Sequence, residues 1–482
     1  MKIFKRHSWK YILVILFTTS VGVILFQRYR LEHVVPTISA ALNDERDFAR
    51  ANSTLRRPNI IFLLTDDHRW DALGAMGNKI IKTPNLDSLA AVGILYLNAY
   101  CTTSICCVSR ASILSGQYQS RHKINDFTSD FSDRAIMNTY PILLKKSGYQ
   151  IGFIGKFGIG GVRQPDSLFD YWSCPKEDQP DYEIINKSGK LVHHTDSIGS
   201  NIKVFLQKFS RKTPFCLSVS FKAPHELDGN PPTYPVQKRF KNLYSDIPID
   251  QPLTSDPRFW DSQPNFFKSN ENIGRTRWKP LLSTAKRHQE TVRNYYRLIS
   301  GVDQVVGDLL KQLKELDIED NTVIVFMGDN GFLLGEHGLE GKWFGFEESI
   351  RVPLIISGAG IAKGIKSSGI ALNIDIAPTF LALAGQSIPE QMQGRDLLRK
   401  ENNLRQDFFY EHTFLGSPQI PKVEGVVSKD FKYMKYIEYG YEEFYDLGKD
   451  QYETKNQIKN DSYKKKIEHY RIRYNELKSK VK

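Results

Sequence analysis

The chain has 482 residues, 40% of them hydrophobic and 12% aromatic, so it can bury a large core, which excludes a small disulfide scaffold, a disordered chain and a coiled coil. One large α/β domain with a smaller second domain is the expected arrangement at this length. The net charge of +12 arises in residues 1–30 and 451–482, and the electrically neutral body between them argues against nucleic acid as a partner.

An uninterrupted run of apolar and small residues over residues 11–26 predicts an export signal. Four basic residues precede it and Arg28 and Arg30 follow it, which favours a cytoplasmic N-terminus and an exported body. The run is intermediate in length between a signal-peptide core and a membrane span. Residues 1–30 are therefore expected to be an uncleaved membrane anchor or, alternatively, a signal peptide, and residues 31–57 a linker. We expect a periplasmic protein, free or anchored through residues 11–26, with secretion as the alternative.

Two continuous apolar runs, residues 59–64 and 322–327, predict buried parallel strands. Polar side chains follow both runs directly: Asp66, Asp67, Asp329 and Asn330. Because ligands bind at the carboxyl ends of parallel strands, these side chains are expected to form one cluster of oxygen ligands. Its three negative charges favour a hard cation, Ca²⁺ before Mg²⁺. Each aspartate taken alone would also suit a turn or a helix cap.

The region between these strands contains a regular and an irregular part. Apolar spacing over residues 295–316 predicts an outer helix. Residues 231–280 hold eight of the chain's 22 prolines, with aromatic and arginine side chains between them. A segment of this kind is expected to be a lid or wall for a polar substrate or, alternatively, a structural excursion.

Towards the C-terminus the pattern changes to short alternating runs at residues 431–437 and 442–447, which predict a small antiparallel sheet. A basic helix is expected from about Ser462, with its charges facing solvent. The predicted fold class is α/β. A mixed or parallel sheet between helices is expected in residues 58–395, and a smaller antiparallel-sheet subdomain in residues 396–482.

Three of the five cysteines lie within seven residues, and an odd count in an exported chain leaves at least one unpaired or modified. Residues 106–116, with the sequence C-C-V-S-R-A-S-I-L-S-G, resemble the signature of the type I sulfatases. That signature is C-x-P-S-R followed by x-x-x-L-[TS]-G, and its first cysteine is oxidised to formylglycine. Arg110, Leu114 and Gly116 fix the register, which assigns this cysteine to Cys106. Further matching segments extend the similarity over about residues 57–455: 58–67, 83–87, 155–156, 223–225, 329–331, 335–342 and 442–447.

The resemblance implies a sulfatase with an alkaline-phosphatase-like fold, in which a formylglycine-generating maturase converts Cys106. The modified Cys106 would join the four oxygen ligands around Ca²⁺. Arg110, Lys156 and Lys342 would bind the sulfate, and His225 would protonate the leaving alcohol. Weaker candidates for substrate binding are His337, His122, His412 and Lys422. The implied substrate is a sulfated polysaccharide or oligosaccharide, as for bacterial polysaccharide sulfatases, with small aryl sulfates as an alternative.

Two residues depart from the family pattern. Val108 stands where the maturation signal has proline or alanine, which is expected to slow recognition by the maturase. Gly158 stands where the family often has a histidine that contacts formylglycine, which predicts a slow second step. Three alternatives stay open: a phosphoester or phosphonate hydrolase of the same superfamily, a non-catalytic glycan-binding relative with unmodified Cys106, and a membrane scaffold protein.

Overall fold

The computed structural model describes residues 57–482 apart from 162, 177–178, 187, 211–212 and 400–404. The expected export segment, and all of the expected linker except Arg57, lie outside the described residues. In the described part of the chain, none of the helices combines the length and the hydropathy that crossing a bilayer requires.

The centre of the described chain is a mixed sheet of nine strands. They are β1 (Asn59–Asp66), β2 (Gly93–Tyr100), β3 (Gln150–Gly155), β4 (Tyr171–Ser173), β7 (Phe215–Pro224), β8 (Thr322–Gly328), β11 (Arg351–Val352), β12 (Leu354–Gly358) and β13 (Ile365–Leu372). The order is β11-β2-β12-β8-β1-β7-β3-β4, with β13 also paired to β2. β1 lies between β7 and β8 and is parallel to both, whereas β12 is antiparallel to β8 and β2. The two predicted apolar runs are therefore neighbouring parallel strands inside a mixed sheet.

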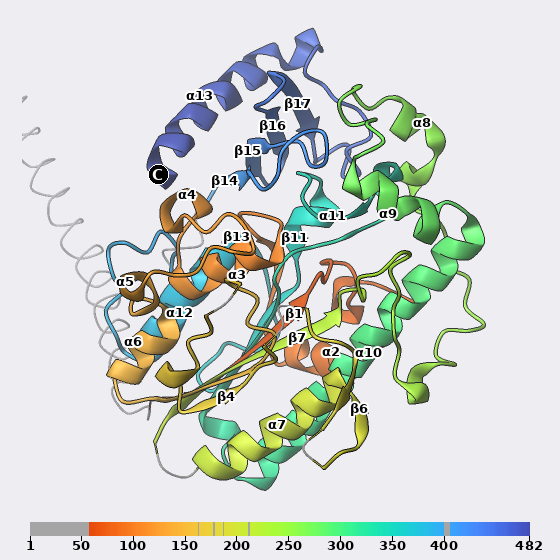
Figure 1. Cartoon of the computed structure of the whole chain (residues 1–482). Coiled ribbons are helices and arrows are strands. Elements are labelled where there is room, and N and C mark those ends of the chain that lie inside the picture. The colour runs from red at the N-terminus through yellow and green to blue at the C-terminus, as the bar shows by residue number, and fades with distance from the viewer. Residues whose placement is uncertain (1–56, 162, 177–178, 187, 211–212, 400–404) are drawn as a thin grey trace, which may run out of the picture. The chain divides into compact units, whose positions relative to one another are not determined.

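Helices cover both faces of this sheet (Figure 1). The principal ones are α2 (Pro84–Ala91), α3 (Cys106–Ser115), α6 (Tyr140–Lys146), α7 (His194–Phe209), α10 (Ala285–Glu315) and α12 (Ile376–Leu383). On β1, Ile61 and Leu63 pack with α2, α7 and α10, whereas Ile60 and Phe62 pack with α3, α6 and α12. A strand that is buried on both faces needs apolar residues at every position, which explains the continuous run in the sequence.

Short elements connect the larger ones. They are α4 (Gln119–His122), α5 (Asp133–Ile136), β5 (Glu183–Ile185), β6 (Leu191–His193), α8 (Pro257–Asp261), α9 (Ile273–Leu282), β9 (Leu333–Leu334), β10 (Glu340–Gly341) and α11 (Glu347–Ile350). The proline-rich segment 231–280 contains α8 and most of α9. It then leads into α10, which begins where the Thr284 hydroxyl caps the backbone N–H of Arg287.

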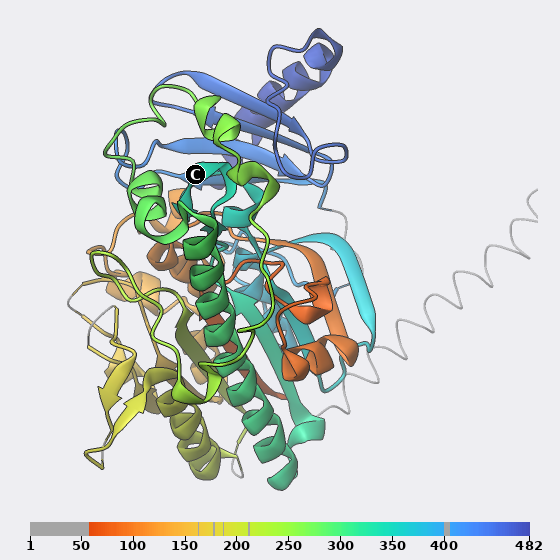
Figure 2. The same ribbon diagram turned by 90° about the vertical axis from the view of Figure 1, so that its right-hand side faces the viewer.

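The C-terminal region is a four-stranded antiparallel sheet covered by a helix (Figure 2). Its elements are β14 (Asp407–His412), β15 (Val423–Ser428), β16 (Phe431–Tyr436), β17 (Tyr441–Asp446) and α13 (Lys464–Val481). α13 buries Ile467, Tyr470 and Tyr474 against the sheet. The central mixed sheet between helices and this second sheet confirm the predicted fold class.

Contacts between the C-terminal sheet and the rest of the chain are extensive, and residues 57–482 form one compact unit. Phe266 of the proline-rich segment stacks on Tyr439 with 4.1 Å between the ring centroids, and Phe267 is buried against Phe344 and Tyr436. Part of the segment is thus a structural connection to the C-terminal sheet. The division at residues 395 and 396 stays a prediction about two subdomains within this unit.

Candidate active site

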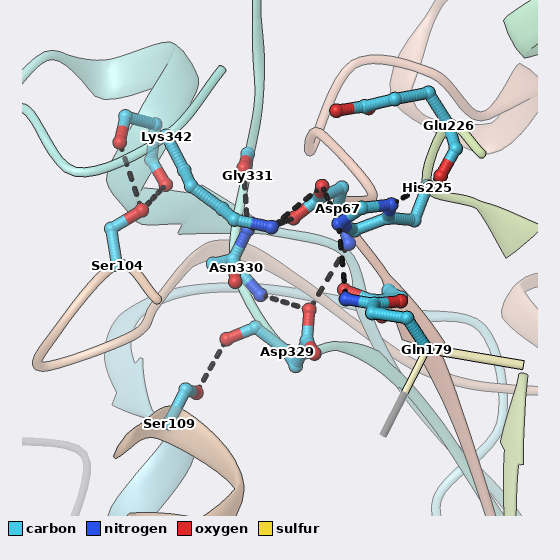
Figure 3. A network of polar contacts seen from close by, with 12 residues as sticks. Asp67, Ser104, Ser109, Gln179, His225, Glu226, Asp329, Asn330, Gly331 and Lys342 are labelled. Carbon is cyan, nitrogen blue, oxygen red and sulfur yellow. Dashed lines mark hydrogen bonds and ion pairs between the residues drawn. The ribbon is translucent and has the colours of Figure 1, made fainter. Parts of the chain in front are cut away.

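Four polar side chains meet at the carboxyl ends of β1 and β8: Asp66, Asp67, Asp329 and Asn330. The backbone N–H of Asp67 donates to Asp329 Oδ1 over 3.1 Å, and the side-chain amide of Asn330 donates to Asp67 Oδ1 over 2.6 Å (Figure 3). Asp67 has a φ of 59°, a sharp change of backbone direction that lets two successive aspartates reach the same cluster. All four side chains are fully buried.

Three buried basic side chains surround the carboxylates: Arg110, Lys156 and Lys342. Lys156 Nζ lies 2.5 Å from Asp66 Oδ2. Lys342 Nζ contacts both oxygens of Asp67 at 2.7 and 2.8 Å. Arg110 donates to Asp329 Oδ2 over 2.9 Å and lies 3.5 Å from Asp66 Oδ2. We call these three basic side chains, together with Asp66, Asp67, Asp329 and Asn330, the catalytic cluster.

The three carboxylates of the catalytic cluster differ in acidity. Burial would raise the pKa of Asp66, but Lys156, His225 and Arg110 outweigh it and hold that pKa well below its usual value. Burial raises the pKa of Asp67 to about 8, although Lys342 opposes the shift. Burial and the Asp66 carboxylate raise the pKa of Asp329 to about 6. Additional positive charge would favour the ionised form of all three carboxylates.

Two buried oxygens at this edge, Asp66 Oδ1 and Asn330 Oδ1, have no hydrogen-bond partner among the described residues. The ligating atoms of Asp66, Asp67 and His225 lie within 4.8 Å of one another. Buried oxygens without a partner are rare unless a ligand completes them, and carboxylate and amide oxygens are what hard cations prefer. The residues present therefore fit a divalent cation.

Cys106 is the first residue of α3, a helix whose residues are all buried. Arg110, a member of the catalytic cluster, follows four residues later, so Cys106 and Arg110 lie on the same side of α3. Burial raises the pKa of the Cys106 thiol, against the opposing effects of Lys156 and Lys342. The unmodified thiol is therefore a poor nucleophile. Ser109 of the same turn donates to the backbone oxygen of Asp329 over 2.5 Å, which fixes α3 against the end of β8.

His225 follows β7 and is 3% exposed. Its Nδ1 lies 2.6 Å from the backbone oxygen of Glu226, to which the Nδ1 proton is donated, and its Nε2 lies 3.4 Å from Asp67 Oδ2. Burial and the neighbouring Lys342 hold the pKa of His225 well below its usual value. Gln179, which the sequence does not single out, approaches the same Nε2 to 3.5 Å (Figure 3).

A second charged group lies beside His225. Arg277 of α9 forms ion pairs with Glu226 and Asp228, and its Nε lies 3.6 Å from Glu340 Oε2. Glu226 and Glu340 are almost fully buried. Arg277 thereby brings the proline-rich segment 231–280 against the catalytic histidine candidate. Partners this far apart along the chain leave no local pattern from which to predict them.

Two of the four weaker candidates for substrate binding are His122 and His337. His122 uses both ring nitrogens, with Ser112 Oγ at 3.0 Å and the backbone N–H of Ile124 at 3.1 Å. His337 stacks on Phe346 with 3.9 Å between centroids. Burial lowers the pKa of both histidines to about 3.

His412 is fully buried and neither of its ring nitrogens has a hydrogen-bond partner among the described residues. The backbone N–H of Lys422 donates to Glu438 over 2.8 Å. In the described part of the chain, none of the hydrogen bonds or ion pairs of His122, His412 or Lys422 includes the catalytic cluster. Substrate binding by the four weaker candidates stays a prediction.

The structure describes the surroundings of the two residues that depart from the family pattern, Gly158 and Val108. Gly158 has a φ of 68°, and a Cβ added there would lie 3.1 Å from Arg110 Cδ and 3.2 Å from Lys156 Cε. A histidine at this position would strain the backbone and crowd two basic side chains of the cluster. Val108 is fully buried in α3.

Comparison with known proteins adds an independent finding. Residues 58–386 match the family model described as sulfatase, and residues 335–480 match the model described as the C-terminal part of N-sulphoglucosamine sulphohydrolase. An N-acetylglucosamine-6-O-sulfatase of Bacteroides thetaiotaomicron is 30% identical over 85% of this chain and 84% of its own. A protein solved with its substrate D-glucosamine-2-N,6-O-disulfate is 27% identical, with a TM-score of 0.78 over 88% of this chain and 98% of its own. The phosphonate monoester hydrolase of Agrobacterium radiobacter has the same fold, with a TM-score of 0.73 over 88% of this chain and 96% of its own, at 20% identity.

Proposed function

Because this chain belongs to the sulfatase family and is therefore a sulfuric ester hydrolase, we propose that its substrate is a sulfated glycan. Sulfated glucosamine or N-acetylglucosamine units are the first choice, since the relative from Bacteroides thetaiotaomicron is named for N-acetylglucosamine and the structural neighbour was solved with glucosamine disulfate as its substrate. The observation that carries the proposal is the set of three buried cations, Arg110, Lys156 and Lys342, around the carboxylates. We also propose that the chain is exported, on the pattern of residues 1–30.

The proposed site contains Ca²⁺ and a modified Cys106. Asp66, Asp67, Asp329, Asn330 and residue 106 would hold the ion, which when bound supplies positive charge that polarises a sulfate oxygen. A maturase would convert Cys106 to formylglycine, whose hydrate offers an oxygen nucleophile in place of the thiol. The raised pKa of the buried thiol supports the need for this change.

We propose roles for the remaining residues that agree with their contacts. Arg110, Lys156 and Lys342 neutralise the charge that builds on the sulfate oxygens in the transition state. His225 would donate a proton from Nε2 to the departing sugar oxygen in its doubly protonated form, which the Asp66 carboxylate favours. The hydrogen bond from its Nδ1 to Glu226 leaves Nε2 facing the site, and Gln179 beside that nitrogen helps to orient the leaving group.

The test is an assay of purified, matured protein on sulfated oligosaccharides, with matched phosphate and phosphonate esters in parallel. We expect hydrolysis of the sulfate esters and loss of it in Cys106→Ala. Faster turnover of the phosphorus esters would favour the phosphonate hydrolase alternative, whose fold this chain shares. Glycan binding without hydrolysis would favour the non-catalytic alternative.

Peptide mass spectrometry tests maturation separately. A tryptic peptide ending at Arg110 should contain an aldehyde at position 106 and a thiol at position 107. Free thiols at both positions, after expression with a competent maturase, would contradict the proposed chemistry.

A further inference from the structure

The backbone changes direction sharply at the end of β1. Successive residues of a strand point to opposite faces of the sheet, so Asp66 and Asp67 would diverge if the strand continued. The strand instead ends at Asp66, and Asp67 has the left-handed conformation described above, with a φ of 59°. A residue other than glycine keeps this conformation only where its surroundings hold it. The position of the Asp67 carboxylate therefore depends on the contacts that fix this turn.

The hydroxyl of Tyr295 in α10 makes two such contacts. It donates to the backbone oxygen of Asp67 over 2.6 Å, and it accepts from the backbone N–H of Arg69 over 3.0 Å. Tyr295 is fully buried, so both hydrogen bonds are shielded from water. One hydroxyl thus satisfies a backbone acceptor and a backbone donor two residues apart, and it closes the turn between them.

The ring of Tyr295 packs at the end of the second strand. It stacks on Phe332 with 6.2 Å between the ring centroids and 15° between the ring planes. Phe332 follows Asn330 by two residues, beyond the end of β8, and is 1% exposed. A single side chain of α10 therefore packs against both segments that supply the four oxygen ligands, the one after β1 and the one after β8.

The other contacts of Asp67 hold its carboxylate and not its backbone. Lys342 Nζ contacts both carboxylate oxygens, and the amide of Asn330 donates to Oδ1. A cation would need the same oxygens. Tyr295 holds only the backbone of Asp67, so its contact leaves both carboxylate oxygens available and can persist when an ion is bound.

We propose that Tyr295 is a positioning residue for the metal site, whose hydroxyl holds the turn at Asp67 so that two successive aspartates face the same ion. This inference rests on the proposed binding of Ca²⁺ and adds a residue of α10 that acts through Asp67. Groups that orient the ligands of a metal typically contribute about 10–100-fold to its affinity. α10 thus supports the site without providing a ligand.

Tyr295→Phe tests the proposal, because it removes the hydroxyl and keeps the ring that packs against Phe332. Calorimetric titration of the matured, full-length protein with Ca²⁺ should give a Kd about 10–100-fold higher than in the wild type. The matched control is Tyr296→Phe, at the next residue of α10. Its side chain is also buried, and its hydroxyl accepts from the side chain of Asn78, which is not one of the four ligands. The Kd of this control should equal that of the wild type.

A second measurement is independent of the ion. Hydrogen exchange at the backbone amide of Arg69, in the presence of a chelator, should be faster in Tyr295→Phe and unchanged in Tyr296→Phe. Both variants should have a native circular dichroism spectrum at the temperature of the titration, so that a change in the stability of the fold does not enter the Kd.

The outcomes separate this inference from the proposed function. A normal Kd in Tyr295→Phe, even with faster exchange at Arg69, would overturn the positioning role alone. An equal rise of the Kd in both variants would also overturn it, since the cause would be a general disturbance of α10. A wild type that does not bind Ca²⁺ would overturn the proposed ion, and this inference with it.

Discussion

Two buried charge clusters in this chain contrast with each other. In the catalytic cluster, Asp66 Oδ1 and Asn330 Oδ1 have no partner. The second cluster joins β16 to α11, where Lys432 Nζ lies 2.9 Å from Glu347 Oε1 and 2.8 Å from Glu453 Oε1. The other oxygens of these two glutamates accept from Tyr100 and from the backbone N–H of Glu347. We call Lys432, Glu347 and Glu453 the Lys432 cluster.

The difference separates a structural role from a binding role. Every carboxylate oxygen of the Lys432 cluster lies within 3.2 Å of a donor atom of the protein, either as an ion pair or as a hydrogen bond, so the cluster needs nothing from outside. The catalytic cluster is equally buried but incomplete, and burying an incomplete charge is costly unless a ligand completes it. Altering the Lys432 cluster should therefore mainly lower the stability of the fold. Altering the catalytic cluster should mainly abolish turnover and the binding of Ca²⁺.

The largest effect should come from Asp329→Asn in the catalytic cluster. The change removes one of three carboxylates and leaves Arg110 without its closest carboxylate partner. Turnover of a sulfated sugar should fall below detection while the circular dichroism spectrum stays native. Asp320→Asn, an exposed acid before β8, is the matched control. A near-normal rate in Asp329→Asn would mean that the site lies elsewhere.

His225→Ala should slow the hydrolysis of sugar sulfates by about 10²–10⁴-fold. Activated aryl sulfates should lose much less, because their leaving groups need no proton. Steady-state rates on one substrate of each class provide the measurement. Equal losses on both classes would make His225 a positioning residue and not the general acid.

Lys432→Met should destabilise the fold by about 3–5 kcal/mol, because it leaves Glu347 and Glu453 buried without their cation. The control is Lys429→Met, at an exposed lysine in the connection between β15 and β16. Chemical denaturation should show little change in the free energy of unfolding for this control. Activity per folded molecule should be retained. If Lys432→Met were as stable as the control, the two clusters would not differ as proposed.

Ca²⁺ should stabilise the protein through the catalytic cluster only. At a free concentration of 100 times the Kd, a ligand that binds the native state adds about 2.7 kcal/mol. Thermal melts with Ca²⁺ and with a chelator should differ in the wild type and in Lys432→Met, and should coincide in Asp329→Asn. A Ca²⁺ response that survives in Asp329→Asn would assign the ion to another site.

The smallest effect concerns pH and His412. Burial lowers its folded-state pKa to about 3 from an ordinary value of 6.5, so the unfolded chain binds the proton more readily. At pH values above the unfolded-state pKa, His412 is neutral in both states and costs no stability. As the pH falls below that pKa, the unfolded chain takes up a proton that the folded protein does not, and the free energy of unfolding decreases. The wild type should lose about 1.2 kcal/mol through His412 between about pH 7 and about pH 5.5. His412→Leu should lack this part of the loss in denaturation curves at both pH values, and parallel losses would contradict the assigned pKa.

The sequence predicts more of the fold than of the site's surroundings. The continuous apolar runs of β1 and β8 and the alternating runs of β16 and β17 follow directly from burial on two faces or on one. Gln179 is not predicted as a site residue, Arg277 is expected only as part of a lid or wall in residues 231–280, and Lys432 is not predicted as the centre of a buried cluster. Their partners lie between about 20 and 85 residues away along the chain. Pairing at such separations is set by tertiary packing and produces no period in the sequence.

The pairing of β1 also sets an order of events during synthesis. The hydrogen bond from the backbone N–H of Asp67 to Asp329 cannot form until Asp329 has been synthesised, 262 residues later. At ordinary rates of synthesis of about 5–20 residues per second, this delay is roughly 13–52 s. Until then the metal edge cannot form, and Cys106 has not yet been covered by β8 and the segments after it. In the finished protein that cysteine is 1% exposed, too enclosed for another enzyme to reach. Any enzyme that modifies Cys106 must therefore act on the growing or unfolded chain, and its opportunity ends when folding does.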